Sequence, residues 1–213
     1  MRGDAPAVEQ SGGSQRQNLT APWPFCHSTF GPKPRTLAGM SDLRYPVGPF
    51  VAPTSFSAAD RAAALTTLAE LPARMRLACA GLTEAQLDTP YRPDGWTVRQ
   101  VVHHTADSHM HAYTRLKFAL SEDNPTIKPY PEHLWAEMAD ARLAPVALSL
   151  DLLDAVHGRL VLLLRSLDDA TFERTMFHPE RGAMSMDDYL ALYHWHSRHH
   201  TAHITALRAR EGW

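Results

Sequence analysis

Four short motifs that start helices constrain the fold of this chain more than any other feature of its sequence. In each, Ser or Thr is followed three residues later by Asp or Gln, so that the two side chains can satisfy the first free N–H groups of a helix. The motifs begin at Ser57, Thr83, Thr97 and Ser185. Thr83 is expected to cap only a short turn. The other three open long helices that end near Ala80, Glu122 and Glu211, and Pro72 is expected to interrupt the first.

A further long helix is expected over roughly 145–167, after a Pro-rich connection over 124–131. No strand-like alternation of apolar and polar residues persists anywhere in the chain. Four long amphipathic helices with one long crossover connection predict an all-α fold, a four-helix bundle.

The first 39 residues differ in composition from the rest of the chain. They are rich in Gly, Pro, Ser, Gln and Arg and show no helical or strand period. Such a segment buries too little apolar surface to offset the entropy lost on ordering. We therefore expect a disordered N-terminal extension over 1–39 and the bundle over 40–213, with Met40 as a candidate for the true start.

The bulk composition excludes several classes of protein. A net charge of −2 gives no electrostatic footprint for nucleic acid. No apolar run approaches the ~20 residues of a membrane span, and the N-terminus lacks an apolar signal segment. Two cysteines are too few for a disulfide framework. The expectation is a cytoplasmic protein that binds neither nucleic acid nor membrane.

Nine of the thirteen histidines fall within 101–111 and 193–203, and both stretches are expected to be helical. At about 100° per residue, His196 and His200 lie roughly 40° apart, inside the apolar stripe of the last helix. Two buried imidazoles without a shared partner would leave several polar nitrogens unsatisfied. A bound metal is therefore favoured over two core histidines that make only hydrogen bonds.

The other histidines of the two stretches are expected nearer to solvent. His199 and His203 have the same spacing as the first pair but are expected at a partly solvated rim. In the helix that starts at Thr97, a helical wheel favours His104 only slightly over His103 as the side chain that faces the bundle. A solvated flank is the simpler expectation for the remaining ones, namely His103, His109 and His111.

Several segments together resemble the YfiT subfamily of the DinB superfamily. The longest is D-T-P-Y-R-P-D-G-W-T-V-R-Q-V-V-H-H-T-A-D-S-H, residues 88–109. The others are S-D-L-R-Y-P-V-G-P-F (41–50), E-D-N-P-T-I-K-P-Y (122–130) and W-H-S-R-H-H-T-A-H-I (195–204). The resemblance spans essentially the whole chain after the first 39 residues.

This resemblance implies a four-helix bundle that holds one divalent ion, zinc or nickel, on three histidines. One ligand lies eight residues after the tryptophan of the second helix, which makes it His104, counted from Trp96. The other two form H-x-x-x-H on the last helix and are His196 and His200. Many relatives carry Gln three residues after the second of these, where this chain has His203, so the role of that position is open. Family members often dimerise, which implies a homodimer here.

Three neutral ring nitrogens leave at least one coordination position open, as in catalytic zinc sites. A water bound there would have a pKa near ~7, and a bound thiol would be deprotonated. The site could thus support hydrolysis or thiol transfer, and the ligands alone do not choose between them. In either case the reacting group is the bound water or thiolate, and no side chain is assigned as catalytic.

No carboxylate base adjoins the expected site in sequence. Ser197 stands where a His-Glu-x-x-His metalloprotease has its glutamate. Asp107 could orient an imidazole, or could be a solvated helix charge. Several residues could line a pocket or simply pack, namely Arg99, Arg198, Tyr130, Trp135 and Tyr193.

Some relatives, by resemblance, transfer a low-molecular-weight thiol such as bacillithiol to electrophiles. Because thiolate attack needs no separate base, thiol transfer to an electrophilic small molecule ranks slightly above metal-dependent hydrolysis. A metal-binding stress protein without turnover ranks third.

Overall fold

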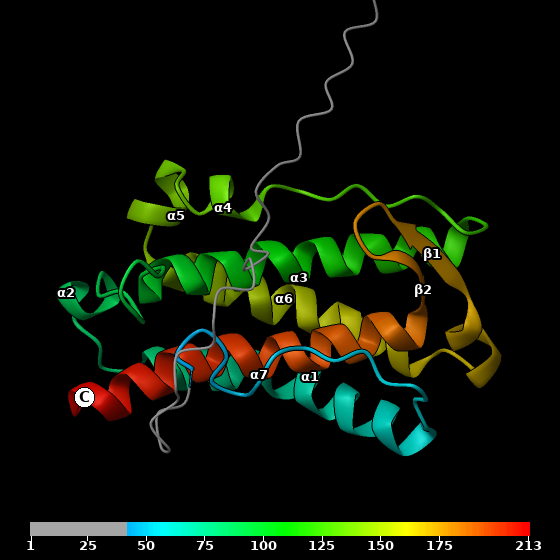
Figure 1. Ribbon diagram of the computed structural model, residues 1–213, viewed down its shortest axis with the longest axis horizontal. Helices are drawn as coiled ribbons and strands as arrows, with labels where there is room; N and C mark the ends of the chain where they lie inside the picture. The colour runs from blue at the N-terminus through cyan, green and yellow to red at the C-terminus, as the bar shows by residue number, and fades with distance from the viewer. Residues whose placement is uncertain (1–41) are drawn as a thin grey trace, which may run out of the picture. The chain divides into compact units, whose positions relative to one another are not determined.

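The computed structural model describes residues 42–213 (Figure 1). The predicted tail over 1–39 and the candidate start Met40 lie outside the described residues. The long helices are α1 (Ala58–Cys79), α3 (Val98–Ser121), α6 (Val146–Arg165) and α7 (Met186–Glu211). The shorter elements are α2 (Glu84–Leu87), α4 (Glu132–Trp135), α5 (Ala139–Leu143), the 3₁₀ helix η1 (Asp169–Glu173), and the strands β1 (Thr175–His178) and β2 (Gly182–Ser185).

The four long helices form the predicted bundle. Helices α1 and α3 each pack against both α6 and α7, so α1 lies diagonally opposite α3. Figure 1 shows α4 and α5 beside α3, on the connection that links α3 to α6. The predicted fold class, an all-α four-helix bundle, is confirmed.

The four predicted start motifs all form reciprocal capping boxes, at Ser57, Thr83, Thr97 and Ser185. In each box the Ser or Thr side chain accepts a hydrogen bond from the backbone N–H of the third residue of the helix. The side chain of that third residue accepts in turn from the backbone N–H of the Ser or Thr. At the other end of α7, Gly212 takes the left-handed conformation (φ 73°), which glycine adopts without steric cost. The helix starts therefore follow directly from local side-chain chemistry.

The expectation that no strand occurs was wrong. Strands β1 and β2 pair antiparallel, with Met176 opposite Met184, and both methionines join the core. Each strand has only four residues, too few for alternation to stand out from a helical sequence.

The expected interruption at Pro72 was also wrong, because α1 continues through it. Proline has no N–H, so it cannot donate to the carbonyl four residues earlier, which belongs to Leu68. In this structure Nδ1 of His157, on α6, lies 2.7 Å from that carbonyl oxygen. A side chain from a neighbouring helix therefore satisfies the acceptor that the proline leaves free.

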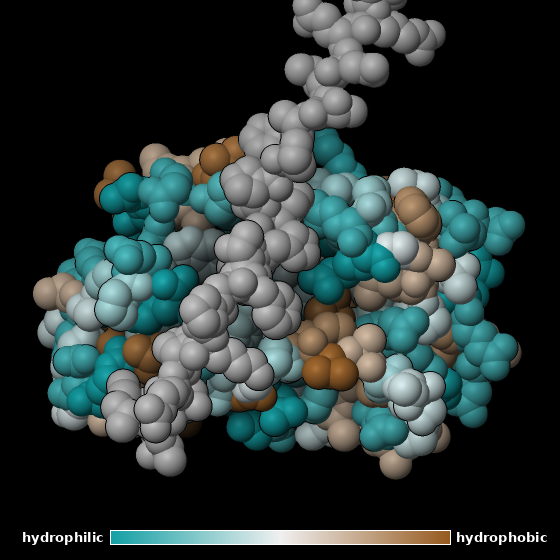
Figure 2. Space-filling view, viewed as in Figure 1, coloured by the Kyte–Doolittle hydropathy of each residue, from teal (hydrophilic) through white to brown (hydrophobic). Residues whose placement is uncertain are grey.

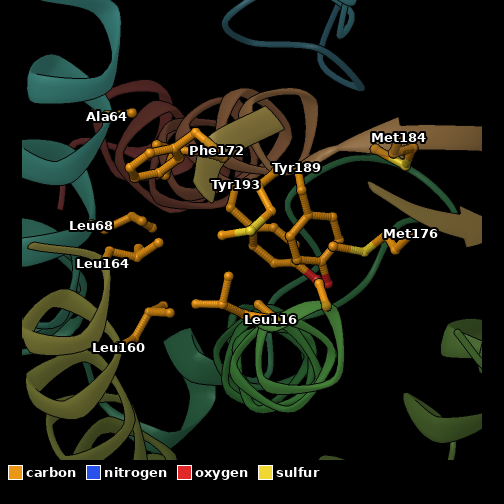
Figure 3. Close-up of a cluster of buried hydrophobic side chains, with 14 of the residues drawn as sticks. Ala64, Leu68, Leu116, Leu160, Leu164, Phe172, Met176, Met184, Tyr189 and Tyr193 are labelled. Atoms are coloured by element: carbon orange, nitrogen blue, oxygen red, sulfur yellow. The ribbon is translucent and has the colours of Figure 1, made fainter. Parts of the chain in front are cut away.

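The core consists of two apolar clusters, one toward each end of the bundle. Figure 3 shows the first, which includes Phe172, Met176 and Met184 and into which Tyr189 and Tyr193 project from α7. The second lies toward the C-terminal end of α7 and includes Ile204 and Leu207. Along every long helix the sequence passes from one cluster to the other, and several histidines lie between them.

The surface seen in Figure 2 is mostly hydrophilic outside the residues drawn in grey, with hydrophobic residues scattered singly or in small groups. Among the described residues, no helix combines the length and apolar character that crossing a membrane requires.

Candidate metal centre

The structure brings together the three histidines that the sequence singled out. His104 comes from α3, and His196 and His200 come from α7, one helical turn apart. Their ring centroids lie 4.4–5.4 Å apart, and one nitrogen from each lies within 4.8 Å of the other two. His104 and His200 are buried, whereas His196 is partly exposed. The arrangement could hold one ion that remains reachable from outside.

Two local features fix these side chains. The H-x-x-x-H spacing sets His196 and His200 on one face of α7. His104 lies in the second turn of α3, and its ring packs 4.6 Å from that of Trp96, which precedes the helix.

The electrostatics keep all three imidazoles neutral. Burial lowers the pKa of His104 to about 3 and holds the pKa values of His196 and His200 well below their usual range. Neighbouring histidines add to the shift, and no carboxylate in the described part of the chain counters it. Neutral imidazole is the form that binds metal.

The donor set also fits a metal in its hydrogen bonding. Nδ1 of His200 is buried without a partner among the described residues, and an unsatisfied buried polar group costs about 1–3 kcal/mol. A divalent cation bonded to these rings would use lone pairs that otherwise have no partner. Imidazole is a favoured ligand for zinc and nickel alike.

His196 is the end of a chain of hydrogen-bonded imidazoles that crosses the bundle between the two apolar clusters. Its Nδ1 lies 3.2 Å from Nε2 of His109. Nδ1 of His109 lies 3.0 Å from Nε2 of His157, whose Nδ1 reaches the Leu68 carbonyl. His109 is 0% and His157 2% exposed.

The carbonyl fixes every proton in this chain when the rings are neutral. A carbonyl only accepts, so Nδ1 of His157 carries a proton and its Nε2 accepts from His109. Nε2 of His109 then accepts from Nδ1–H of His196. The remaining lone pair of His196 is on Nε2, free to bind a metal. The Leu68 carbonyl that Pro72 leaves free thus fixes the tautomer of His196 through two hydrogen-bonded histidines, His157 and His109.

The prediction that His103 and His109 lie on a solvated flank of the helix was wrong, since both are buried. His103 approaches Ser149 Oγ (2.7 Å) and the Ala144 carbonyl (3.1 Å), so both of its nitrogens are occupied. His111 is partly buried against Tyr130. Sequence reasoning missed His157 altogether, although its place between Leu153 and Leu160 in an apolar stripe was a usable signal.

A second histidine group adjoins the first. His199, His200 and His203 also place one nitrogen each within 4.8 Å of the others, and all three are buried. The prediction that His199 and His203 lie at a partly solvated rim was therefore wrong. Their rings stack on Trp195 (4.2 Å) and Tyr91 (3.9 Å), respectively. The second group shares His200 with the first, so the groups compete for that ligand.

Asp107 does not orient an imidazole. It makes no hydrogen bond or ion pair with any residue of the described range. Burial, and the nearby charge of Asp140, raise the pKa of Asp107 to about 6.

Comparisons with known proteins agree with this architecture. The sequence profile of the DinB superfamily matches residues 67–204. A protein of Bacillus mycoides named "Putative metal-dependent hydrolase" is 50% identical over 174 residues, which are 82% of this chain and all of that protein. A protein of Bacillus cereus with the same description shows the same identity and coverage.

A solved structure agrees as well. YfiT from Bacillus subtilis, described as a probable metal-dependent hydrolase with an unusual four-helix bundle topology, superposes with a TM-score of 0.78. It is 46% identical in sequence, and the match covers 80% of this chain and 98% of YfiT. With the relatives' names and the histidine cluster, this likeness implies a metal ion. The chain belongs to the DinB superfamily and is YfiT-like.

Proposed function

We propose that this chain is a metal-dependent hydrolase in which His104, His196 and His200 hold one divalent ion, zinc in the first instance and nickel as the alternative. The observation that supports it most is the meeting of three neutral imidazoles from two helices. Within residues 42–213 no carboxylate joins them, and Nδ1 of His200 has no hydrogen-bond partner. The names of the relatives support the same reaction class.

A divalent ion held by His104, His196 and His200 would keep an open coordination position and would supply a nucleophile near neutral pH by making water more acidic. The chain's own residues orient this centre. The His109–His157 chain ends on a backbone carbonyl, which cannot pass a proton on. It therefore holds His196 in one tautomer and does not relay protons. Protons and substrates exchange on the partly exposed side of His196.

Thiol transfer, which the sequence ranked first, is the second candidate. The relatives' names favour hydrolysis, so the order of the two is reversed. One observation still favours thiol transfer: no carboxylate base lies at the histidine group within the described range. The metal-loaded protein, incubated with a thiol and an electrophilic acceptor, separates the two. Hydrolysed acceptor would support the proposal, and a thioether product would support thiol transfer. If neither product forms, the result supports a protein that only binds metal.

Metal content of the purified protein tests the ligands. His104→Ala and His200→Ala should each lose the bound ion. His103→Ala is the matched control, because that neighbouring histidine is equally buried but has both nitrogens hydrogen-bonded, so it should retain the ion. Retention in His104→Ala with loss in His203→Ala would instead assign the ion to the second histidine group. A homodimer and a small-molecule substrate stay predictions.

A further inference from the structure

One buried arginine has no carboxylate partner among residues 42–213. Arg115, on α3, is 7% exposed. Its Nη2 donates to the Lys128 carbonyl (2.6 Å), and the hydroxyl of Tyr189 lies beside the guanidinium. Nε is buried without a partner. Neither Asp nor Glu forms an ion pair with Arg115 in the range that the structure describes.

Another arginine on the same helix shows how unusual this is. Arg99 is 4% exposed, yet it donates to the carboxylates of both Glu84 and Asp88. Burying a cation without a counter-ion is costly. The environment of Arg115 therefore lacks the negative charges that the environment of Arg99 has.

Two more unpartnered polar atoms lie next to Arg115. They are the hydroxyl of Tyr130, which lies near the side chain of Ser108, and Nε2 of His111, both buried. The two rings stack with centroids 4.4 Å apart, and Cζ of Arg115 lies 5.9 Å from the Tyr130 centroid. Burial raises the pKa of Tyr130, so its hydroxyl is a neutral donor. Three buried polar atoms without hydrogen-bond partners thus belong to three neighbouring residues.

We propose that Arg115, Tyr130 and His111 form a subsite for a carboxylate group of a small molecule. A carboxylate could accept from Nε of Arg115 and from the Tyr130 hydroxyl together, which would satisfy both and supply the missing charge. Nε2 of His111 can donate as a third partner. The negative charges of Glu132 and Asp107 lie close enough to raise the pKa of Tyr130. Because they would repel an anion at this place, a ligand with a single negative charge fits better than a phosphate with two.

The subsite lies on the same face of α3 as the candidate metal centre. At 100° and 1.5 Å per residue, His104, His111 and Arg115 fall within about 40° of one another, and His104 and Arg115 are about 16 Å apart along the helix. Tyr193, which points toward α3 (Figure 3), lies between the two: its hydroxyl donates to the Ser108 carbonyl (3.1 Å) and its ring is 5.6 Å from that of His196.

A substrate with a carboxylate at one end could therefore place its reacting bond at the metal. This role rests on the proposed function, whereas the binding of a carboxylate does not.

Acetate is the probe, and acetamide is its neutral isostere. The midpoint of thermal unfolding is followed as acetate replaces chloride at constant ionic strength. The measurement is made on the full chain and on His104→Ala, in which acetate cannot bind through a metal held by that residue. The variants are Arg115→Met, which removes the charge, and Tyr130→Phe, which removes one hydroxyl. Arg99→Met is the matched control on the same helix.

Acetate should raise the midpoint saturably in the full chain, His104→Ala and Arg99→Met, with half-saturation in roughly the millimolar range. Arg115→Met and Tyr130→Phe should bind acetate at least about tenfold more weakly. Arg115→Met should itself unfold at the same or a higher temperature, since it removes a buried unpaired charge.

The subsite is wrong if acetate has no saturable effect, if acetamide acts equally, or if Arg115→Met keeps the response. Loss of the response in His104→Ala would move the acetate to the metal. If His104→Ala instead keeps both its metal and its acetate response, the proposed ligands fail while the subsite stands.

Discussion

Replacement of His109 by phenylalanine tests the link between the histidine chain and the candidate metal centre. The change keeps a ring of similar size in a site that is 0% exposed but removes both hydrogen bonds, to His196 (3.2 Å) and to His157 (3.0 Å). It leaves one nitrogen of each partner unsatisfied, at a cost of about 1–3 kcal/mol per group.

The expected loss of metal affinity follows from the freedom that His196 gains. Without His109 its proton can move to Nε2, which removes the lone pair that would bind the ion. Loss of a partner that orients a metal-bound histidine typically costs 10–100-fold in affinity, or about 1.4–2.8 kcal/mol.

The assay is competition for Zn²⁺ with a chromophoric chelator. His157→Phe is the graded comparison. It leaves the His109–His196 hydrogen bond but removes the link to the Leu68 carbonyl that fixes the direction of that bond, so the affinity should fall by less. His103→Ala should bind as the unchanged protein does. Unchanged affinity in His109→Phe would refute the reasoning. So would a ¹⁵N spectrum of the metal-free protein with the proton of His196 on Nε2.

Three further results are expected. Removing the metal with a chelator should lower the midpoint of thermal unfolding of the unchanged protein but not that of His200→Ala, because an ion that binds only the folded state stabilises it. Equal midpoints of the unchanged protein before and after chelation would contradict this. Asp107 has its pKa raised to about 6 by burial, so its charge destabilises the folded state above that pH, and the penalty is absent below about pH 4. After a discount for its partial exposure, Asp107→Asn should add about 1 kcal/mol to the free energy of unfolding at pH 7.5 and nothing at pH 3.5, measured by urea titration; a larger gain at low pH would reverse the sign. Burial raises the pKa of the Cys79 thiol to about 11, so Cys79 should react with a thiol reagent only as fast as the protein unfolds. Rapid labelling at Cys79 itself in the native protein, located by peptide mapping, would disagree.

The helix starts could be predicted because each depends on four consecutive residues. Ser57, Thr97 and Ser185 cap the helices α1, α3 and α7 as their local sequences indicate. The pair His196 and His200 could also be predicted, because both lie within the apolar stripe of a single helix.

The choice between His103 and His104 could not be made from a helical wheel. Every residue over 98–106 of α3 is buried, because α5 packs on the side of α3 away from the bundle centre. A wheel assumes one solvated face, and this part of α3 has none. The burial of His199 and His203 likewise depends on Tyr91 and on the chain around Arg44, segments without a periodic pattern.

The proton order in the histidine chain depends on contacts between four helices. Pro72 indicates that one carbonyl loses its helical partner, but only the packing of α6 against α1 brings His157 to it. Arg115 gives no signal in the sequence, since the absence of a counter-ion is visible only once the neighbours are known.

Anomalous diffraction at the zinc absorption edge, from crystals of the zinc-loaded protein, tests the ligand assignment most directly. A single peak is expected, with bonds of about 2.0–2.1 Å to one ring nitrogen each of His104, His196 and His200. A peak bonded to His199 and His203, or no peak at the histidine groups, would contradict the assignment.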